Sequence, residues 1–197
     1  MESPPPNLMG NPNGACAGLG EAATVARALL DPAAFAPLYQ RYLDPVYRYC
    51  YRRLGSREAA EDATSLVFER AFRSLSAFRG GSFRAWLFAI AHNAVTDIYR
   101  RHGTERFQED WDIEDPAPPP EQMALLADER RLLATALALL PRDQRHVIEL
   151  RLSGVSSVEV ADILGRSPQA VRALQLRATR RLQTLLGTST TPEVRHA

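Results

Sequence analysis

The residues best suited to chemistry lie between positions 155 and 186, and their chemistry is that of binding. Ala161 is a small residue in a short apolar helical stretch, and Gly165 follows it at the spacing of a helix-turn-helix motif. The small residue lets the second helix of such a motif cross the first, and the glycine supplies the positive φ of the turn. The sequence therefore predicts two consecutive helices, over 157–164 and 167–186.

The second of these helices has an apolar face and an opposite polar face when its residues are placed at intervals of about 100°. The polar face carries arginine, which can donate two hydrogen bonds to guanine, and glutamine, which can pair with adenine. We therefore expect this helix to lie in the major groove of DNA. The apolar face comprises Val171, Leu174, Ala178 and Leu182. The candidate DNA-contacting residues are Arg166, Ser167, Gln169, Arg172, Leu176, Arg177 and Arg180.

Two of these candidates have alternative interpretations. Ser167 either donates to a phosphate or only caps the helix. Leu176 contacts a thymine methyl group or a protein partner, or it is one of the apolar residues that commonly lie exposed without a role.

A helix predicted over 83–101 carries aromatic residues on the face opposite its apolar stripe. The stripe comprises Phe83, Trp86, Leu87, Ile90 and Ala94, and the opposite face carries Phe88, His92 and Tyr99 beside Arg84, Arg100 and Arg101. Aromatic rings beside arginines suit stacking on unpaired bases, and each stacked base contributes about 1–3 kcal/mol. That free energy is comparable with the cost of unstacking one base step. The helix is therefore a candidate for binding melted DNA.

Alternatives remain for several residues of this helix. Phe88 and Tyr99 either stack on bases or pack against another helix of the same domain. Asn93 and Asp97, at the edge of the stripe, either read a flipped base or form hydrogen bonds within the domain. The loop 77–81 either holds an extruded base or only connects two helices.

The chain lacks the sequence patterns of an enzyme. Its four histidines are isolated from one another, and no glycine-rich phosphate loop, metal-spaced His/Cys pair or Ser/His/Asp set is found. We expect no catalytic site, no metal and no cofactor. Cys16 and Cys50 form no disulfide framework, and Cys50 is expected in the core. Without an apolar run of membrane-spanning length or a secretory signal, the expected compartment is the cytoplasm, with no membrane insertion.

Helical periodicity begins near position 22, and no alternating apolar pattern of strand length occurs. The predicted fold class is therefore all-α, with two small helical domains joined by a flexible acidic and proline-rich linker. Residues 1–21 are expected to be a disordered lead-in and 187–197 a tail. The first domain, 22–102, is expected to contain helices over 32–54 (bent or broken near Pro45), 57–74 and 83–101. The second domain, 121–186, is expected to contain helices ending at Leu140 and Ser153 before the helix-turn-helix.

The formal net charge of +1 hides an uneven distribution. The net charge is +5 over 35–103, −6 over 104–121 and +4 over 122–186. Basic blocks suit a polyanionic partner, although clustered charges can also form ordinary solvated surfaces. The acidic segment coincides with the predicted linker, 103–120.

Three motifs together give the chain a family resemblance. Leu140–Arg151 followed by the helix-turn-helix resembles region 4 of sigma-70 factors. Phe83–Arg101 resembles region 2 of their extracytoplasmic-function (ECF, group IV) subgroup, and Ala60–Arg73 looks like the polymerase-binding helix of that region. The chain is identified by this resemblance as a member of the ECF subgroup of RNA polymerase sigma factors.

The resemblance implies a function and a set of partners. Region 2 would dock on the clamp helices of the largest subunit of core RNA polymerase and open the −10 element of promoter DNA. Region 4 would lie on the flap of the second-largest subunit and read the −35 element with the residues given above. The residues of region 2 implied to contact the −10 element are Phe88, His92, Asn93, Asp97, Tyr99, Arg100 and Arg101. The implied polymerase contacts of region 2 are Asp62, Ser65 and Glu69. An anti-sigma factor is a further possible partner.

The sequence departs from the family pattern at some of these positions. Ser65 and Leu66 replace the usual Gln-Glu pair, His92 stands where relatives often have arginine, and Leu176 stands where they commonly have histidine. The departures bear on the promoter sequence rather than on the class of protein. The alternative class is a conventional helix-turn-helix regulator that does not bind polymerase, which would usually need a dimer interface and an effector pocket.

Overall fold

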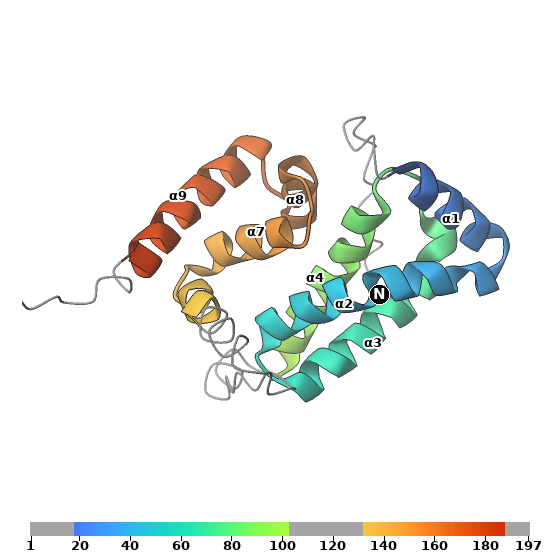
Figure 1. Ribbon diagram of the computed structural model, residues 1–197, viewed down its shortest axis with the longest axis horizontal. Coiled ribbons are helices and arrows are strands. Elements are labelled where there is room, and N and C mark those ends of the chain that lie inside the picture. The colour runs from blue at the N-terminus through green and yellow to red at the C-terminus, as the bar shows by residue number, and fades with distance from the viewer. Residues whose placement is uncertain (1–17, 103–131, 188–197) are drawn as a thin grey trace, which may run out of the picture.

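The computed structural model describes residues 18–102 and 132–187, which fold into helices with no strand among them (Figure 1). The all-α prediction is confirmed. The predicted linker lies outside the described residues, as do nearly all of the lead-in and the tail. The first domain contains α1 (Gly18–Leu30), a 3-10 turn (Pro32–Phe35), α2 (Ala36–Leu54), α3 (Arg57–Ser74), a second 3-10 turn (Leu75–Ala77) and α4 (Phe83–His102).

Local sequence signals set the ends of these helices. The side chain of Asp31 accepts a hydrogen bond from Ala33 N at 2.9 Å and caps the first 3-10 turn, and Gly55, at φ 73°, ends α2. Ser56 and Ser82 cap α3 and α4 in the same manner. These capping positions agree with the sequence-based predictions.

Helix α2 is not broken at Pro45. It continues through this residue as one α-helix, and only the turn before it, Pro32–Phe35, is 3-10. Proline removes one backbone hydrogen bond to the residue four positions earlier, here Arg41, which is exposed, so water can bond the carbonyl that is left.

The core of the first domain lies between α2, α3 and α4. Phe88 of α4 packs edge-to-face on Tyr49 of α2 with ring centroids 5.6 Å apart, and both side chains are fully buried. Cys50 is also fully buried, and Trp86 packs on Phe83, as expected for core residues. Each large apolar side chain buried in this way contributes about 1.5–3 kcal/mol.

The second domain contains a helical segment over 132–138, followed by α7 (Arg142–Leu152), α8 (Ser157–Leu164) and α9 (Pro168–Gly187). Ser156 and Glu159 form a reciprocal capping box at the start of α8. Gly165 ends α8 with φ 61°, and Ala161 is buried where α8 meets α9. The helix-turn-helix prediction is confirmed in its geometry.

The two domains pack directly on each other. Helix α8 contacts α4 and α7 contacts α2 (Figure 1), and residues of both domains join one hydrophobic cluster. Arg53 Nη1 lies 3.2 Å from Glu149 Oε2, and both side chains are buried. Arg84 Nη1 donates to the carbonyl of Ser153 at 2.9 Å. We call this packing of 18–102 on 132–187 the closed arrangement. The sequence indicated two separate modules and gave no sign of it.

Candidate nucleic-acid and polymerase interfaces

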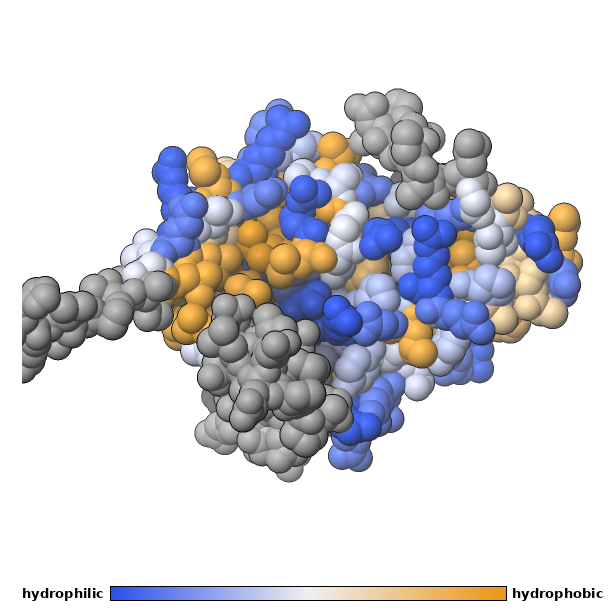
Figure 2. Space-filling model, in the orientation of Figure 1, coloured by the Kyte–Doolittle hydropathy of each residue, from blue (hydrophilic) through white to orange (hydrophobic). Residues whose placement is uncertain are grey.

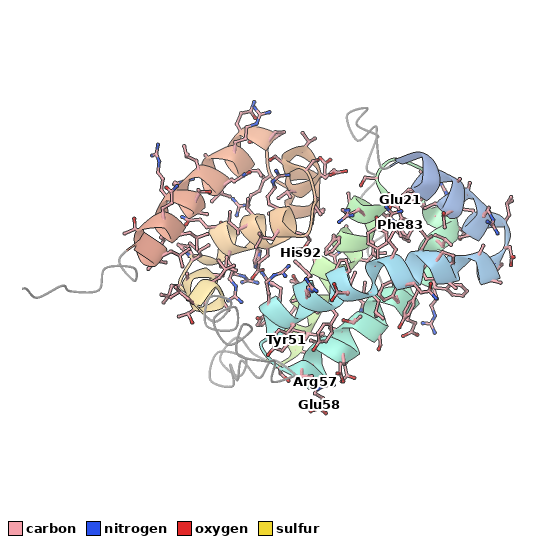
Figure 3. The ribbon with its side chains drawn as sticks, in the orientation of Figure 1. Glu21, Tyr51, Arg57, Glu58, Phe83 and His92 are labelled. Atoms are coloured by element: carbon pink, nitrogen blue, oxygen red, sulfur yellow. The ribbon has the colours of Figure 1, made fainter. Side chains whose placement is uncertain are left out.

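The polar face of α9 is exposed along its length. Its apolar residues Val171 and Leu174 turn inward, and Leu176 on the outer face is 53% exposed. All seven candidate DNA-contacting residues on the turn and helix are exposed. Figure 3 shows side chains with terminal nitrogens that project from α9 away from α7 and α8. The helix therefore presents one continuous polar surface.

Charge on this surface is positive and largely unpaired. Helix α9 contains no acidic residue, and Arg172 and Arg180 have no ion-pair partner among the described residues. Arg166 is an exception, because its Nη2 lies 2.6 Å from Asp143 Oδ2. Ser167 Oγ accepts from Ala170 N at 3.2 Å and therefore caps α9. That contact establishes the capping role and leaves the phosphate contact as a prediction.

The prediction that Phe88 lies on a solvent-exposed face, opposite the apolar stripe of α4, is wrong. Its side chain is 0% exposed and packs on Tyr49. Helix α4 has the second domain on one side and α2 and α3 on others, so buried residues run around its circumference from Phe83 to Val95. A helix that is apolar on most sides is a core helix. Dividing such a helix into one buried and one exposed face therefore assigns some buried residues, here Phe88, to solvent.

His92 and Tyr99 face the second domain in the closed arrangement. His92 Nδ1 lies 3.2 Å from the Tyr49 hydroxyl, and its ring meets the ring of His146 edge-to-face at 5.2 Å. Figure 3 shows His92 where α4 approaches the second domain. The Tyr99 hydroxyl donates to the carbonyl of Arg53, whose guanidinium lies 5.6 Å from the Tyr99 ring centroid. Both residues are half-buried rather than open to solvent.

Burial and positive charge lower the pKa of His92 to about 4, with Arg53 and then Arg142 adding to the effect of desolvation. The imidazole is therefore neutral near pH 7. A neutral imidazole can accept a hydrogen bond from the Tyr49 hydroxyl or donate one to it. It adds no further positive charge beside the arginines at the junction of the two domains.

The remaining candidates on α4 are accessible or paired within the domain. Asn93, Arg100 and Arg101 are exposed. Asp97 accepts from Arg70 Nη1 at 3.2 Å and from Arg100 Nη2 at 3.1 Å. The structure therefore favours the hydrogen-bonded interpretation for Asp97.

The three candidate polymerase contacts share an exposed face of α3. Asp62, Ser65 and Glu69 are all exposed. Ser65 Oγ donates to the carbonyl of Glu61 at 3.0 Å, and Glu69 Oε1 lies 2.8 Å from Arg73 Nη2. Neither contact buries this face of α3, so a partner protein can reach all three side chains.

Sequence reasoning missed the residues that join the domains. Glu149 is buried, and its carboxylate accepts hydrogen bonds from Arg145 Nε at 2.8 Å and from Arg53 Nη1. Arg145 Nη2 also donates to the carbonyl of Arg52 at 2.5 Å. One signal was present, because Glu149 is a lone acidic residue in the apolar part of α7. A buried carboxylate requires a cationic partner, but the sequence does not say which arginine supplies it.

Two further properties concern the described residues only. None of their helices combines the length and the apolar character needed to cross a bilayer. No group of three or more His, Cys, Asp or Glu side chains in these residues is arranged to hold a metal ion.

Two family models match the chain. Sigma-70 region 2 matches residues 38–105, and sigma-70 region 4 matches residues 130–182. The first covers α2 to α4, and the second covers α7, α8 and most of α9. Together the two matches span more than half of the sequence.

Curated relatives carry the same family name. The chain is 38% identical over 162 residues to the ECF RNA polymerase sigma factor BldN of Streptomyces coelicolor, an alignment that covers 78% of this chain and 60% of BldN. It is 35% identical to the ECF sigma factor SigE of Mycolicibacterium smegmatis, covering 76% of this chain and 60% of SigE. It is 34% identical to SigD of Mycobacterium tuberculosis, covering 70% of each chain. The chain thus spans about 60% of the length of BldN and of SigE.

Solved structures share the fold. CnrH in complex with the cytosolic domain of CnrY has a TM-score of 0.65 and 26% identity, covering 85% of this chain and 97% of that one. The sigma factor RpoE in complex with the anti-sigma factor NepR, from Bartonella quintana, has a TM-score of 0.62 and 29% identity, covering 78% and 96%.

Proposed function

Because the chain belongs to the extracytoplasmic-function subgroup of the sigma-70 family, we propose that it binds core RNA polymerase and directs promoter-specific initiation of transcription. The observation that carries the proposal is the exposed, acid-free face of α9 in a chain that also contains region 2. In this role the protein contributes recognition, and the polymerase contributes the chemistry. The protein then has no catalytic site and acts in the cytoplasm, where polymerase and DNA meet.

Helix α9 is proposed to read the −35 element. Its inward residues fix it against α7 and α8, so the outer arginines and Gln169 can enter the major groove on a rigid support. Arg172 is the central candidate for a guanine contact, because it is exposed and unpaired among the described residues. Arg177 and Arg180 suit phosphate contacts, and Leu176 suits a thymine methyl group.

The exposed part of α4 is proposed to engage the −10 element. Asn93, Arg100 and Arg101 are accessible in the closed arrangement, whereas the His92 ring meets His146 and Tyr99 shares a cavity wall with residues of the second domain. Phe88 is no longer a candidate, because it belongs to the core. Stacking of a base on Tyr99 therefore requires the two domains to separate. Polymerase binding, which would hold the domains at different sites, supplies the reason for them to do so.

The proposed polymerase surfaces are the exposed face of α3, for the clamp helices, and the second domain, for the flap. Asp62, Ser65 and Glu69 are the candidate contacts on α3. An anti-sigma factor is a further proposed partner, because the similar sigma factor RpoE was solved in complex with the anti-sigma factor NepR.

In vitro transcription with purified core enzyme tests the proposal. Genomic templates that include the region upstream of its own gene should yield specific transcripts only when this protein is added. The protein should also comigrate with core polymerase in gel filtration. Duplex binding without polymerase association or added transcripts would instead indicate a conventional helix-turn-helix regulator.

A further inference from the structure

A small cavity of about 140 Å³ lies at the junction of the two domains. Arg53 and Tyr99 line it from the first domain, and Arg142, Arg145 and His146 line it from the second. Ala138 and Leu140 complete the wall. Figure 2 shows hydrophilic surface where α2 meets the second domain. Neither domain alone contains the full set of lining residues.

The lining is strongly positive. Among the described residues, Glu149 is the carboxylate that pairs with the arginines of this wall, and it receives both Arg53 and Arg145. Arg142 has no ion-pair partner among the described residues and adds an uncompensated charge. Burial, followed by the field of Arg53, lowers the pKa of His146 to about 2. The positive charges of Arg142 and Arg145 also lower this pKa.

Two buried polar atoms in this wall have no hydrogen-bond partner among the described residues. They are Nε of Arg53, a residue 5% exposed, and Nε2 of His146, a residue 9% exposed. Buried polar atoms in folded proteins are almost always hydrogen-bonded, so two such atoms in one wall point to a group that is absent from the structure.

A helix terminus adds to the same site. Helix α7 is 11 residues long and begins at Arg142, beside the cavity, and no side chain caps its first turn. Backbone N–H groups and the helix dipole at such an end favour an anion. Planar guanidinium groups also favour a phosphate, because each can donate two parallel hydrogen bonds to its oxygens.

We propose that this cavity binds the phosphate groups of a small phosphorylated molecule, which bridges the two domains and stabilises the closed arrangement. The volume is below the roughly 300–1,000 Å³ of pockets that enclose a drug-sized ligand. It therefore fits a phosphate or diphosphate group, and any remainder of the ligand would extend outside. A carboxylate supplies fewer acceptor oxygens for three arginines, an imidazole and a helix terminus.

The division of the lining between two domains gives binding a consequence. The ligand binds the closed arrangement and loses the contacts of one domain when the domains part, so it shifts the population toward the closed form. In that form the His92 ring meets His146 of the second domain, and Tyr99 faces the cavity that the ligand fills. The ligand would therefore oppose promoter opening, a consequence that rests on the proposed function, whereas the binding itself does not.

Calorimetric titration of the full chain with inorganic pyrophosphate and, separately, with adenosine diphosphate tests the site. The wild type should bind pyrophosphate saturably, and Arg142→Ala should bind it about tenfold more weakly because one charge-assisted contact is lost. Arg27→Ala, at an exposed arginine far from the cavity in sequence, is the matched control and should bind like the wild type. If adenosine diphosphate binds more tightly than pyrophosphate, the ligand is a nucleotide whose nucleoside also contacts the protein. If the two bind equally, the site recognises only the phosphate groups.

Two further measurements separate the bridge from simple charge attraction. Bound pyrophosphate should raise the pKa of His146 in an NMR titration, because the anion offsets the positive field. Fluorescent labels at Glu58→Cys and Gln183→Cys, in a Cys16→Ser background, should report a larger closed fraction with pyrophosphate. Absence of saturable binding, or equal binding by Arg142→Ala, overturns the site. Binding without a change in the closed fraction overturns the bridge. Neither readout uses polymerase, so failure here is distinct from failure of the proposed function.

Discussion

Replacing Glu149 by glutamine should separate the two domains while leaving each of them folded. The Glu149 carboxylate holds Arg53 Nη1 at 3.2 Å and Arg145 Nε at 2.8 Å, and the Arg53 and Glu149 side chains are nearly inaccessible to solvent. Removing one partner of a buried ion pair costs about 3–5 kcal/mol, because the remaining charge stays buried without compensation. A cost of about 3 kcal/mol shifts an equilibrium by more than 100-fold.

That cost bears on the interface more than on either domain. Arg53 lies in the last turn of α2, which α7 contacts, and we expect separation of the domains to give its guanidinium access to water. Opening is therefore an easier response than unfolding. A chain that is already open should also bind core polymerase with higher apparent affinity, since less of the population has to change conformation first.

Energy transfer between the labels at Glu58→Cys and Gln183→Cys measures the opening, and circular dichroism measures helix content. Glu149→Gln should lower the closed fraction with helix content unchanged. Asp44→Asn is the control, because the Asp44–Arg48 pair is exposed at 2.9 Å and such pairs contribute at most about 1 kcal/mol. A closed fraction equal to that of the wild type, or loss of helix content without opening, would refute the reasoning.

Four other predictions follow from single contacts. Arg172→Ala should weaken duplex binding at the −35 element by about 1–3 kcal/mol in fluorescence anisotropy, and equal loss on every DNA sequence would contradict a base contact. Gly154→Ala should lower the free energy of unfolding of the second domain by about 1–2 kcal/mol, since φ is 81° there; an unchanged stability in denaturant titrations would argue against it. Acidification from pH 6.5 to 4 should lower the free energy of unfolding by up to about 3 kcal/mol through His92, because the unfolded chain binds the proton more tightly; His92→Gln should make this slope shallower in denaturant titrations and leave the part due to His146, whose pKa is also lowered. Tyr99→Ala should spare duplex binding yet reduce permanganate reactivity at the −10 element, and full reactivity would remove Tyr99 from strand opening.

Most of the fold could be predicted because its signals are local. Ser56 as a cap, Gly55 and Gly165 as helix ends, and the Val171 stripe each depend on neighbours within a few positions. The bounds Arg57–Ser74 and Ser157–Leu164 agree with the predicted helices for that reason. Likewise α9, which packs on one side only, separates into an inner and an outer face as its periodicity indicates.

The errors arose where contacts are distant in sequence. Phe88 was placed on a wet face because α4 was treated as covered on one side, whereas it is covered on several. The Arg53–Glu149 pair joins residues 96 positions apart, and any of several arginines could have supplied the cation. The roles of individual residues toward DNA and polymerase stay predictions, because exposure permits a contact without identifying the partner.

Cys50 gives the chain a built-in indicator of which kind of opening has occurred. Its thiol is enclosed within the first domain, and burial raises its pKa to about 12, so almost no reactive thiolate exists at neutral pH. Domain separation leaves α2 packed on α3 and keeps this sulfur protected from alkylating reagents. Loss of the first domain's own core would expose it. In a Cys16→Ser chain, slow alkylation together with low energy transfer would therefore identify a molecule that has parted at its junction but kept both halves folded.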